Sequence, residues 1–444
     1  MRIRCCFWGL CCRNILSLIN FIFLLFIVSF LWLQLHVGSL KSQSLDQKLE
    51  RKYNNVAVNT GKVGSTLNST VISAPLVLEH VKQAIKKINS EQLIINSYKY
   101  GPLSSGNPVI VIQVHNRYQY LSALISSLQQ TKGIEKVLIV FSHDLFDREI
   151  NQLIQKISFC KVTQIFYPHS IQLHPNTFPG QDPNDCPRDM KKEEALVKGC
   201  NNAHYPDRYG HFREASYTQA KHHWWWKMNY VFDDLEVTRN HTGPFLFLEE
   251  DHFVFPDILH VLNLMEELKT KDCSTCNILC LGNYAKSFNF PAKGNQVEVT
   301  KWLSSKHNMG MVINRPLWTQ IKMCAKDFCT FDDYNWDWTL QHVSFSCLPS
   351  PLNVMVTVSS RVLHIGECGV HHKGKDCSSE RVVRRAESIL SAARRYLFPT
   401  SLSLHQGLRR TLRVPKGNGG WGDIRDHKLC LQQADKNYTL ISPR

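Results

Sequence analysis

The chain has 444 residues, of which 43% are hydrophobic and 20% charged, and a formal net charge of +15. It contains neither an internal repeat nor a low-complexity tract, and its apolar content is sufficient for a large folded core. A basic balance can indicate nucleic-acid binding, but Lys and Arg are scattered along the chain, and the membrane segment described next argues against nucleic acid as a partner.

The N-terminal segment predicts a membrane anchor. Residues 1–14 carry three arginines and no acid, and Ile15 to Leu35 then runs for 21 residues without a charge. Such a run can span the roughly 30 Å hydrocarbon core as a helix, and basic residues before it favour a cytosolic N-terminus. We therefore expect a cytosolic tail (1–14), a signal-anchor helix (15–36), a polar lumenal stem (37–95) and a catalytic domain (96–444) in a single-pass type II membrane protein.

Cysteine usage and glycosylation sequons agree with a lumenal body. Twelve of the 16 cysteines lie at Cys160 or beyond, in a compartment where disulfides persist. The sequons predict glycosylation at Asn68, Asn240 and Asn437, although each triplet is a weak signal by itself.

The first elements of the body predict an α/β fold. Apolar runs at Val109–Val114, 137–141 and 162–166 read as buried strands, and amphipathic helical patterns separate them. This alternation predicts a Rossmann-like mixed sheet flanked by helices, in which ligands bind at the carboxyl ends of the strands. Because neither G-x-G-x-x-G nor a Walker-type loop follows the first strand, a nicotinamide enzyme and a P-loop NTPase are disfavoured.

Polar residues follow the apolar runs where ligands would bind. The first strand ends in His115-Asn116-Arg117 and the second in Ser142-His143-Asp144, and the apolar run from Phe245 ends in Glu249-Glu250-Asp251-His252. Carboxylates at a strand end can hold a divalent cation that binds a diphosphate. Taken by itself, the acidic segment Glu249–His252 has an alternative interpretation as a solvent-exposed turn without a cation.

A segment rich in histidine and tryptophan also contains candidate ligand-binding residues. Gln219 to Lys227 reads as a helix whose tryptophans pack in the core, and whose Gln219, Lys221, His222 and His223 would face a nucleotide. Adjacent histidines on one helix cannot both face one metal ion, so we do not interpret them as a zinc site.

The segment around Asp337 places acids among aromatic residues. Asp337 lies between Trp336 and Trp338 and is a candidate general base, with Trp336 as a candidate acceptor contact. The alternative for the nearby acids Asp332 and Asp333 is helix capping. His364 directly follows an apolar run and could be a neutral imidazole ligand to manganese.

These motifs together resemble those of the N-acetylglucosaminyltransferase II family, from about residue 98 to the C-terminus. The segments that carry the resemblance are QVHNR (113–117), FSHD (141–144), QAKHHWWWK (219–227), FLEEDH (247–252), TFDDYNWDWTLQ (330–341) and NGGWGDIRDH (418–427). The resemblance implies a GT-A fold in a Golgi membrane enzyme that needs Mn²⁺. Such an enzyme would transfer N-acetylglucosamine (GlcNAc) from UDP-GlcNAc, with inversion, to the 2-hydroxyl of the α1,6-arm mannose of an N-glycan.

The resemblance also implies roles for individual residues. Asp337 would be the catalytic base, and Asp251 and His364 would hold Mn²⁺. Glu249 and Glu250 would shape the donor pocket. UDP-GlcNAc would be bound by Gln113, Val114, His115, Asn116, Arg117, Asp144, Gln219, Ala220, Lys221, His222, His223 and Glu250.

The disulfides that the resemblance implies are Cys186–Cys200, Cys273–Cys276, Cys324–Cys347, Cys329–Cys430 and Cys368–Cys377, which leaves Cys160 and Cys280 as buried thiols. The chain departs from the family near Cys368, where Glu367 stands in place of an expected Asp. Two alternatives are a type II lectin-like receptor and the sibling transferase of the α1,3 arm. The sequence leaves open whether the chain forms a homo-oligomer.

Overall fold

A nine-stranded sheet organises the computed structural model, which describes residues 74–285, 287–366, 378–407 and 415–435. The strand order is β11-β7-β9-β6-β8-β4-β1-β2-β3. The strands are β1 (Val109–Val114), β2 (Leu138–His143), β3 (Lys161–Phe166), β4 (Phe245–Glu249), β6 (Ile278–Cys280), β7 (Gln296–Lys301), β8 (Met311–Ile313), β9 (Asn353–Thr357) and β11 (Ser403–Gln406). A separate antiparallel pair joins β5 (His252–Val254) to β10 (Val362–His364).

Parallel pairing dominates the part of the sheet that the sequence predicted. β4, β1, β2 and β3 are mutually parallel neighbours. β8 pairs antiparallel with both β4 and β6, and β7 pairs antiparallel with β9. The predicted α/β fold with a mixed, Rossmann-like sheet is therefore confirmed at this level.

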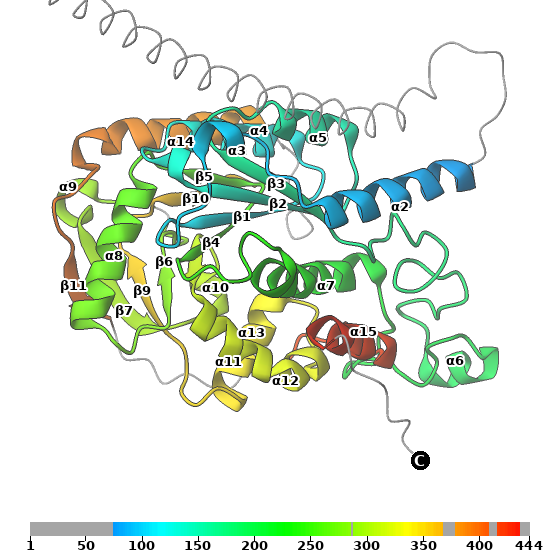
Figure 1. Cartoon of the computed structure of the whole chain (residues 1–444). Helices are drawn as coiled ribbons and strands as arrows, with labels where there is room; N and C mark the ends of the chain where they lie inside the picture. The colour runs from blue at the N-terminus through cyan, green and yellow to red at the C-terminus, as the bar shows by residue number, and fades with distance from the viewer. Residues whose placement is uncertain (1–73, 286, 367–377, 408–414, 436–444) are drawn as a thin grey trace, which may run out of the picture. The chain divides into compact units, whose positions relative to one another are not determined.

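Helices cover both faces of the sheet (Figure 1). The longer ones are α2 (Ala74–Glu91), α4 (Tyr118–Gln129), α5 (Arg148–Gln155), α6 (Lys192–Lys198), α7 (Ala215–Asn229), α8 (Ile258–Asp272), α11 (Arg315–Met323), α12 (Ala325–Thr330), α13 (Trp336–Ser346), α14 (Ser379–Ala393) and α15 (Ile424–Ala434). Three four-residue helices complete the set: α3 (Ser97–Tyr100), α9 (Phe290–Lys293) and α10 (Ser304–His307).

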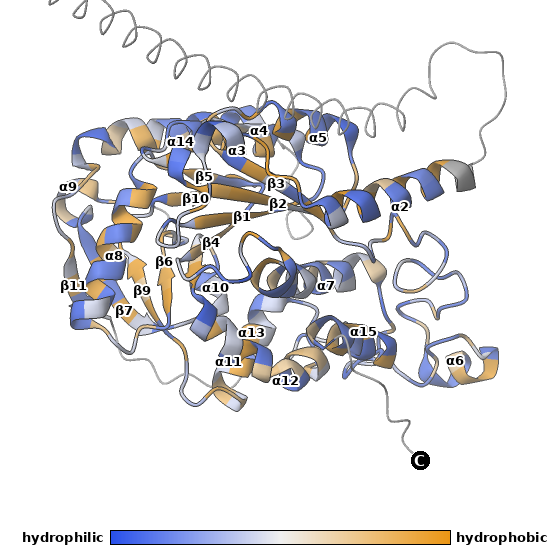
Figure 2. Ribbon diagram, in the orientation of Figure 1, coloured by the Kyte–Doolittle hydropathy of each residue, from blue (hydrophilic) through white to orange (hydrophobic). Residues whose placement is uncertain are grey.

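Alternation along the central strands divides the core into two layers. Val109 and Val111 of β1 pack with the tryptophans of α7 on one face, whereas Ile110 and Ile112 pack with α4, α5 and α8 on the other. Successive strand residues point to opposite faces, so a continuous apolar run is what a sheet covered on both sides requires. The central strands are accordingly the most hydrophobic part of the ribbon (Figure 2).

The folded body begins before residue 96. Ile85 and Ile88 of α2 are buried, and the Asn89 side chain exchanges two hydrogen bonds with the backbone of Phe166, at 2.7 and 2.8 Å. Residues that we assigned to the stem therefore pack on the edge strand β3.

Four of the five implied disulfides are present, namely Cys186–Cys200, Cys273–Cys276, Cys324–Cys347 and Cys329–Cys430. Cys160 and Cys280 are buried free thiols, as expected. Asn240 is exposed, as a glycosylation site must be. Cys368–Cys377, Asn68, Asn437 and the predicted signal-anchor helix lie outside the described residues. Among the helices of the described ranges, none has the length and apolarity needed to cross a bilayer.

Candidate active site

The carboxyl ends of β1, β2 and β4 form one edge. In the parallel register, Gln113 lies beside both Ser142 and Glu249. The polar segments that follow these three strands therefore meet, as the sequence predicted.

Glu250 holds the loop after β1. Its Oε2 accepts hydrogen bonds from the backbone N–H groups of His115 (2.8 Å) and Arg117 (3.4 Å), and its Oε1 accepts from Nε of Arg117 at 2.8 Å. The Glu250 side chain is 2% exposed, so these charge-assisted bonds hold the loop that follows β1 in place. Within that segment, Val114 is buried, and Asn116 is exposed on the loop.

Asp144 connects this loop to helix α7. Its Oδ1 lies 2.7 Å from Nδ1 of His115, and its Oδ2 accepts a hydrogen bond from Nε2 of Gln219 at 2.9 Å. Burial opposes the charge of Asp144, but the hydrogen bond from His115 and the nearby charge of His223 keep its pKa below the usual value. Asp144 is thus an ionised acceptor at the strand edge.

One face of α7 follows the ends of the strands. Nε2 of His223 lies 2.8 Å from Oγ of Ser142, and Nζ of Lys227 donates to Oε1 of Gln113 at 2.7 Å. Gln219, His223 and Lys227 are spaced by four residues, so they share a face of the helix. Ala220, one residue along, is exposed.

Lys221 and His222 do not join this group, contrary to our prediction. Nζ of Lys221 donates to the carbonyls of Phe331 (3.1 Å) and Asp333 (2.8 Å), and Nε2 of His222 lies 2.9 Å from Oδ1 of Asp426. Successive helical residues are separated by about 100° around the axis, so Lys221 points away from Gln219 and His223, and His222 is turned by about 100° from His223. Both side chains are buried. Lys221 holds the 331–333 segment against α7, and His222 holds Asp426 of α15 there.

Asp251 and His364 come together at the end of the β5–β10 pair. Nε2 of His364 lies 3.2 Å from Oδ2 of Asp251, and Nη1 of Arg117 lies 2.7 Å from the same oxygen. Burial would raise the pKa of Asp251, but the hydrogen bond and charge of His364 keep it well below its usual range. Gly366 permits this geometry, because a Cβ there would lie 2.1 Å from Oδ2 of Asp251.

Glu249, Asp251 and His252 form a candidate site for a divalent cation, and His364 lies against Asp251 without belonging to that cluster. Oδ1 of Asp251 is buried and has no hydrogen-bond partner among the described residues. One candidate ligand atom from each of Glu249, Asp251 and His252 lies within 4.8 Å of the others. A carboxylate with a free oxygen beside imidazole nitrogens is a donor set that suits Mn²⁺ and related ions.

Asp337 occupies the first turn of α13, away from the strand edge. Its Oδ2 accepts a hydrogen bond from Nδ2 of Asn308 at 3.0 Å, and its Oδ1 accepts from the backbone N–H of Trp338 at 2.8 Å. Burial raises the pKa of Asp337 to about 6, partly offset by the bonds from Trp338 and Asn308. Trp336 is half-buried and stacks on Trp224, with ring centroids 4.6 Å apart.

The acids Asp332 and Asp333 serve the fold through hydrogen bonds to the backbone, but neither caps α13, whose N-cap residue is Asn335. Oδ1 of Asp333 accepts from the backbone N–H of Asn335 at 2.8 Å, and Oδ2 accepts from the backbone N–H of Asn418. Oδ2 of Asp332 accepts from the backbone N–H of Arg208 at 2.7 Å.

Tyr284 links the two acidic centres and was not found from the sequence. Burial, and then the negative charges of Glu249, Asp337 and Asp251, raise the pKa of its phenol. Tyr284 also lines one cavity together with Met309 and His364. Asn308, the residue before Met309, donates to Asp337, and His364 contacts Asp251, so contacts of both acidic centres reach this cavity. Tyr284, like Asn308, lies in a segment without a catalytic motif, so only the folded structure reveals it.

Lys227, which is buried, and Glu249, which is half-buried, carry opposite charges at this edge and affect each other's pKa. Burial raises the pKa of Glu249 and lowers that of Lys227, and the charge of each partner opposes this effect. The helix periodicity could have selected Lys227, because it continues the 219–223 face.

A mixed α/β sheet with a candidate cation site at its carboxyl edge and a separate, half-buried aspartate is the arrangement expected of a glycosyltransferase active site. The N-acetylglucosaminyltransferase II (MGAT2) family model matches residues 82–430, well over half of the chain. The chain belongs to the N-acetylglucosaminyltransferase II family.

Curated relatives give the same family. The chain is 46% identical over 350 residues to the alpha-1,6-mannosyl-glycoprotein 2-beta-N-acetylglucosaminyltransferase of Mus musculus, covering 79% of each chain. It is also 46% identical to the Homo sapiens protein of that name (79% and 78% covered) and 35% identical to the Arabidopsis thaliana one (76% and 77%). This membership argues against the lectin-like receptor and the α1,3-arm transferase.

Among solved structures, S. aureus TarS 1-349 in complex with UDP-GlcNAc matches with a TM-score of 0.32 and 8% identity, covering 64% of this chain and 66% of that one. A likeness of this size carries no argument about the site.

Proposed function

We propose that this chain is an inverting, GT-A type, metal-dependent β1,2-GlcNAc transferase. It transfers GlcNAc from UDP-GlcNAc to the 2-hydroxyl of the α1,6-arm mannose of N-glycans. The observation that supports this most strongly is the single cavity that Tyr284, Met309 and His364 line, because Asp251 contacts His364 and Asp337 contacts Asn308, the residue before Met309. An inverting displacement needs one base on the acceptor side and charge neutralisation on the leaving-group side, and these two centres can divide that work.

The donor side lies along the edge of β1, β2 and β4. Gln113 to Arg117 and Asp144 would contact the uridine, with Glu250, Gln219 and His223 keeping them in position. Asp251 and His364 would hold Mn²⁺, which when bound neutralises negative charge on the UDP leaving group. Arg117 lies close enough to Asp251 to orient its carboxylate.

The acceptor side is centred on Asp337. With a pKa of about 6, its carboxylate is mostly ionised at neutral pH and still basic enough to take a proton from a sugar hydroxyl. The hydrogen bonds from Asn308 and Trp338 fix its direction. Trp336 would present the part of its ring that Trp224 leaves open to the acceptor sugar.

The cellular setting is part of the proposal. The uncharged 15–36 segment would anchor the chain in the Golgi membrane as a single-pass type II protein with its catalytic domain in the lumen. The four disulfides agree with an oxidising compartment.

Incubation with UDP-GlcNAc, Mn²⁺ and a defined N-glycan that carries GlcNAc on the α1,3 arm tests the proposal. We expect one added GlcNAc, in β1,2 linkage to the α1,6-arm mannose, by mass and linkage analysis. No transfer, or transfer to another position, would refute it.

A further inference from the structure

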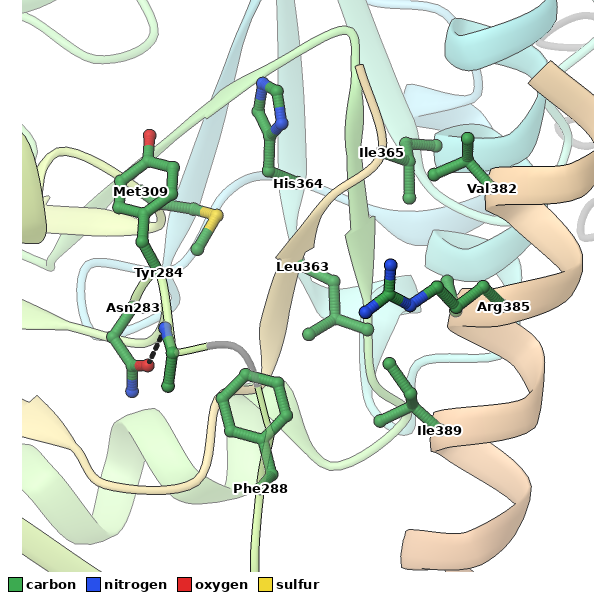
Figure 3. A pocket seen from close by; sticks show the side chains of 12 residues that line it. Asn283, Tyr284, Phe288, Met309, Leu363, His364, Ile365, Val382, Arg385 and Ile389 are labelled. Atoms are coloured by element: carbon green, nitrogen blue, oxygen red, sulfur yellow. Dashed lines mark hydrogen bonds between the residues drawn. The ribbon is translucent and has the colours of Figure 1, made fainter. Parts of the chain in front are cut away.

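A cavity of about 220 Å³ adjoins the candidate cation site. It is lined by residues of the 283–288 segment, of β10 and of α14, and His364 belongs both to this lining and to the cation site (Figure 3). The cavity is smaller than the roughly 300–1,000 Å³ of a pocket for a whole drug-sized ligand. It therefore suits one group of a ligand whose remainder lies outside.

The lining is apolar, with a few polar groups at its border. Phe288, Leu363 and Ile389 supply part of the apolar wall, and Arg385 extends from α14 toward Leu363 (Figure 3). A guanidinium carries five N–H donors and accepts no hydrogen bond. A group with a small apolar end and a hydrogen-bond acceptor therefore fits this lining.

The mouth of the cavity is held in a fixed position. Oδ1 of Asn283 accepts from the backbone N–H of Ala285 at 2.9 Å, drawn as the dashed line in Figure 3, and Nδ2 of Asn283 donates to the carbonyl of Thr357 at 2.7 Å. The backbone N–H of Asn283 donates to Oγ of Ser360 at 2.7 Å. These bonds tie Tyr284 to the end of β9, so that its ring lies 6.2 Å from the ring of His364.

The position of the cavity selects one part of the donor. Under the proposed function, the anomeric carbon would lie between Asp251, which would hold the cation, and the base Asp337. His364 contacts Asp251 and lines the cavity, and Asn308 contacts Asp337 and precedes Met309, which also lines the cavity, so the donor sugar would lie beside it. The substituent nearest to that carbon is the one on the adjacent C2 atom. In GlcNAc this substituent is an acetamido group, which has a methyl end and a carbonyl oxygen.

We propose that this cavity receives the 2-acetamido group of the donor sugar and that Arg385 and Ile389 determine donor specificity. The methyl group packs against Leu363, Phe288 and Ile389, and the Arg385 guanidinium donates to the acetamido carbonyl. This inference rests on the proposed function, because it takes the donor to be a UDP-hexosamine. It adds the element that distinguishes UDP-GlcNAc from UDP-glucose, which lacks the acetamido group.

Calorimetric titration of UDP, UDP-GlcNAc and UDP-glucose in the presence of Mn²⁺ tests this. We expect the wild type to bind UDP-GlcNAc more tightly than UDP-glucose. Arg385→Met removes the donors and keeps the aliphatic stem, and Ile389→Trp fills the cavity. Each should reduce the preference for UDP-GlcNAc about tenfold, with the affinity for UDP unchanged.

The matched control is Arg384→Met. Arg384 is the neighbouring exposed arginine of α14, and its Nη2 donates to Oε2 of Glu380 at 3.1 Å instead of lining the cavity. This variant should keep the wild-type preference. If Ile389→Trp loses UDP binding through misfolding, the difference in donor preference between Arg385→Met and Arg384→Met still tests the inference.

Two results would overturn the inference: a wild type that binds the two nucleotide sugars equally, or an unchanged preference in Arg385→Met. Failure of the proposed function would look different, because the wild type would then bind no UDP or transfer no GlcNAc.

Discussion

Nε2 of His364 lies 3.2 Å from Oδ2 of Asp251, although His364 ends β10 and Asp251 lies in the turn before β5, far away in the sequence. The antiparallel pairing of β10 with β5 sets His364 opposite His252, next to Asp251. A short two-stranded ribbon outside the main sheet thus assembles the candidate cation site.

Asp251→Ala should abolish metal-dependent UDP binding. Calorimetric titration with UDP and Mn²⁺ should show an affinity at least ~100-fold weaker than that of the wild type, because the buried carboxylate is the anionic ligand. Asp272→Asn, which removes an exposed carboxylate at the end of α8, is the control and should bind normally. An unchanged dissociation constant in Asp251→Ala would disprove the metal role.

The transfer rate should fall at acidic pH. Asp337 can take a proton only when ionised, and burial raises its pKa to about 6. The rate at saturating Mn²⁺ and donor should therefore be near its plateau above pH 7 and fall about tenfold per pH unit well below pH 6. A rate that stays constant from pH 7 to pH 5 would show that Asp337 is not the base.

Asn308→Ala should move this acidic limb to higher pH. The hydrogen bond from Asn308 favours the ionised form of Asp337 and lowers its pKa, so its removal raises the pKa further. The variant should lose activity at pH 6.5 more than at pH 8, with UDP affinity unchanged. Asn263→Ala, at an exposed position on α8, should leave the profile in place. A uniform loss at every pH would indicate a role for Asn308 other than tuning Asp337.

Asp426→Asn should destabilise the fold without altering the donor site directly. Asp426 is fully buried between Nε of Arg213, at 2.8 Å, and Nε2 of His222, at 2.9 Å. Loss of its charge leaves the Arg213 guanidinium buried and unpaired, which costs about 3–5 kcal/mol. Chemical denaturation should show this loss, and Asp272→Asn should change the free energy of unfolding by less than about 0.5 kcal/mol. Equal stability of the two variants would contradict the structural role of the contacts of Asp426 with Arg213 and His222.

The helix α7 shows what the sequence could and could not predict. Its existence, the burial of Trp224 and Trp225 and the contacts of Gln219 and His223 with the strand edge follow from composition and position. His222 lies three residues from Gln219, and only the folded structure shows that it contacts Asp426 instead. Lys221 was wrongly placed because residue type was given more weight than the helix period. Applying that period strictly would have selected Lys227 instead.

Contacts between segments that are distant in the sequence could not be predicted from local patterns. Local patterns predicted β1, β2 and β3, since their apolar runs and intervening helices are contiguous in sequence. Nothing local pairs β8 with both β4 and β6, or brings Asn308 to Asp337, because such contacts depend on how distant segments fold onto one another. The prediction that His364 lies beside Asp251 came from the resemblance to a family and not from the sequence pattern around His364.

The division of work between Asp251 and Asp337 is the central claim, and Asp337→Asn tests it most directly. The measurement is the rate of GlcNAc transfer at saturating UDP-GlcNAc and Mn²⁺, with the UDP dissociation constant determined on the same preparation. We predict near-normal UDP binding and a loss of transfer of at least ~100-fold, because the amide retains the shape of the side chain and cannot take a proton. Near-normal turnover in this variant would contradict the account.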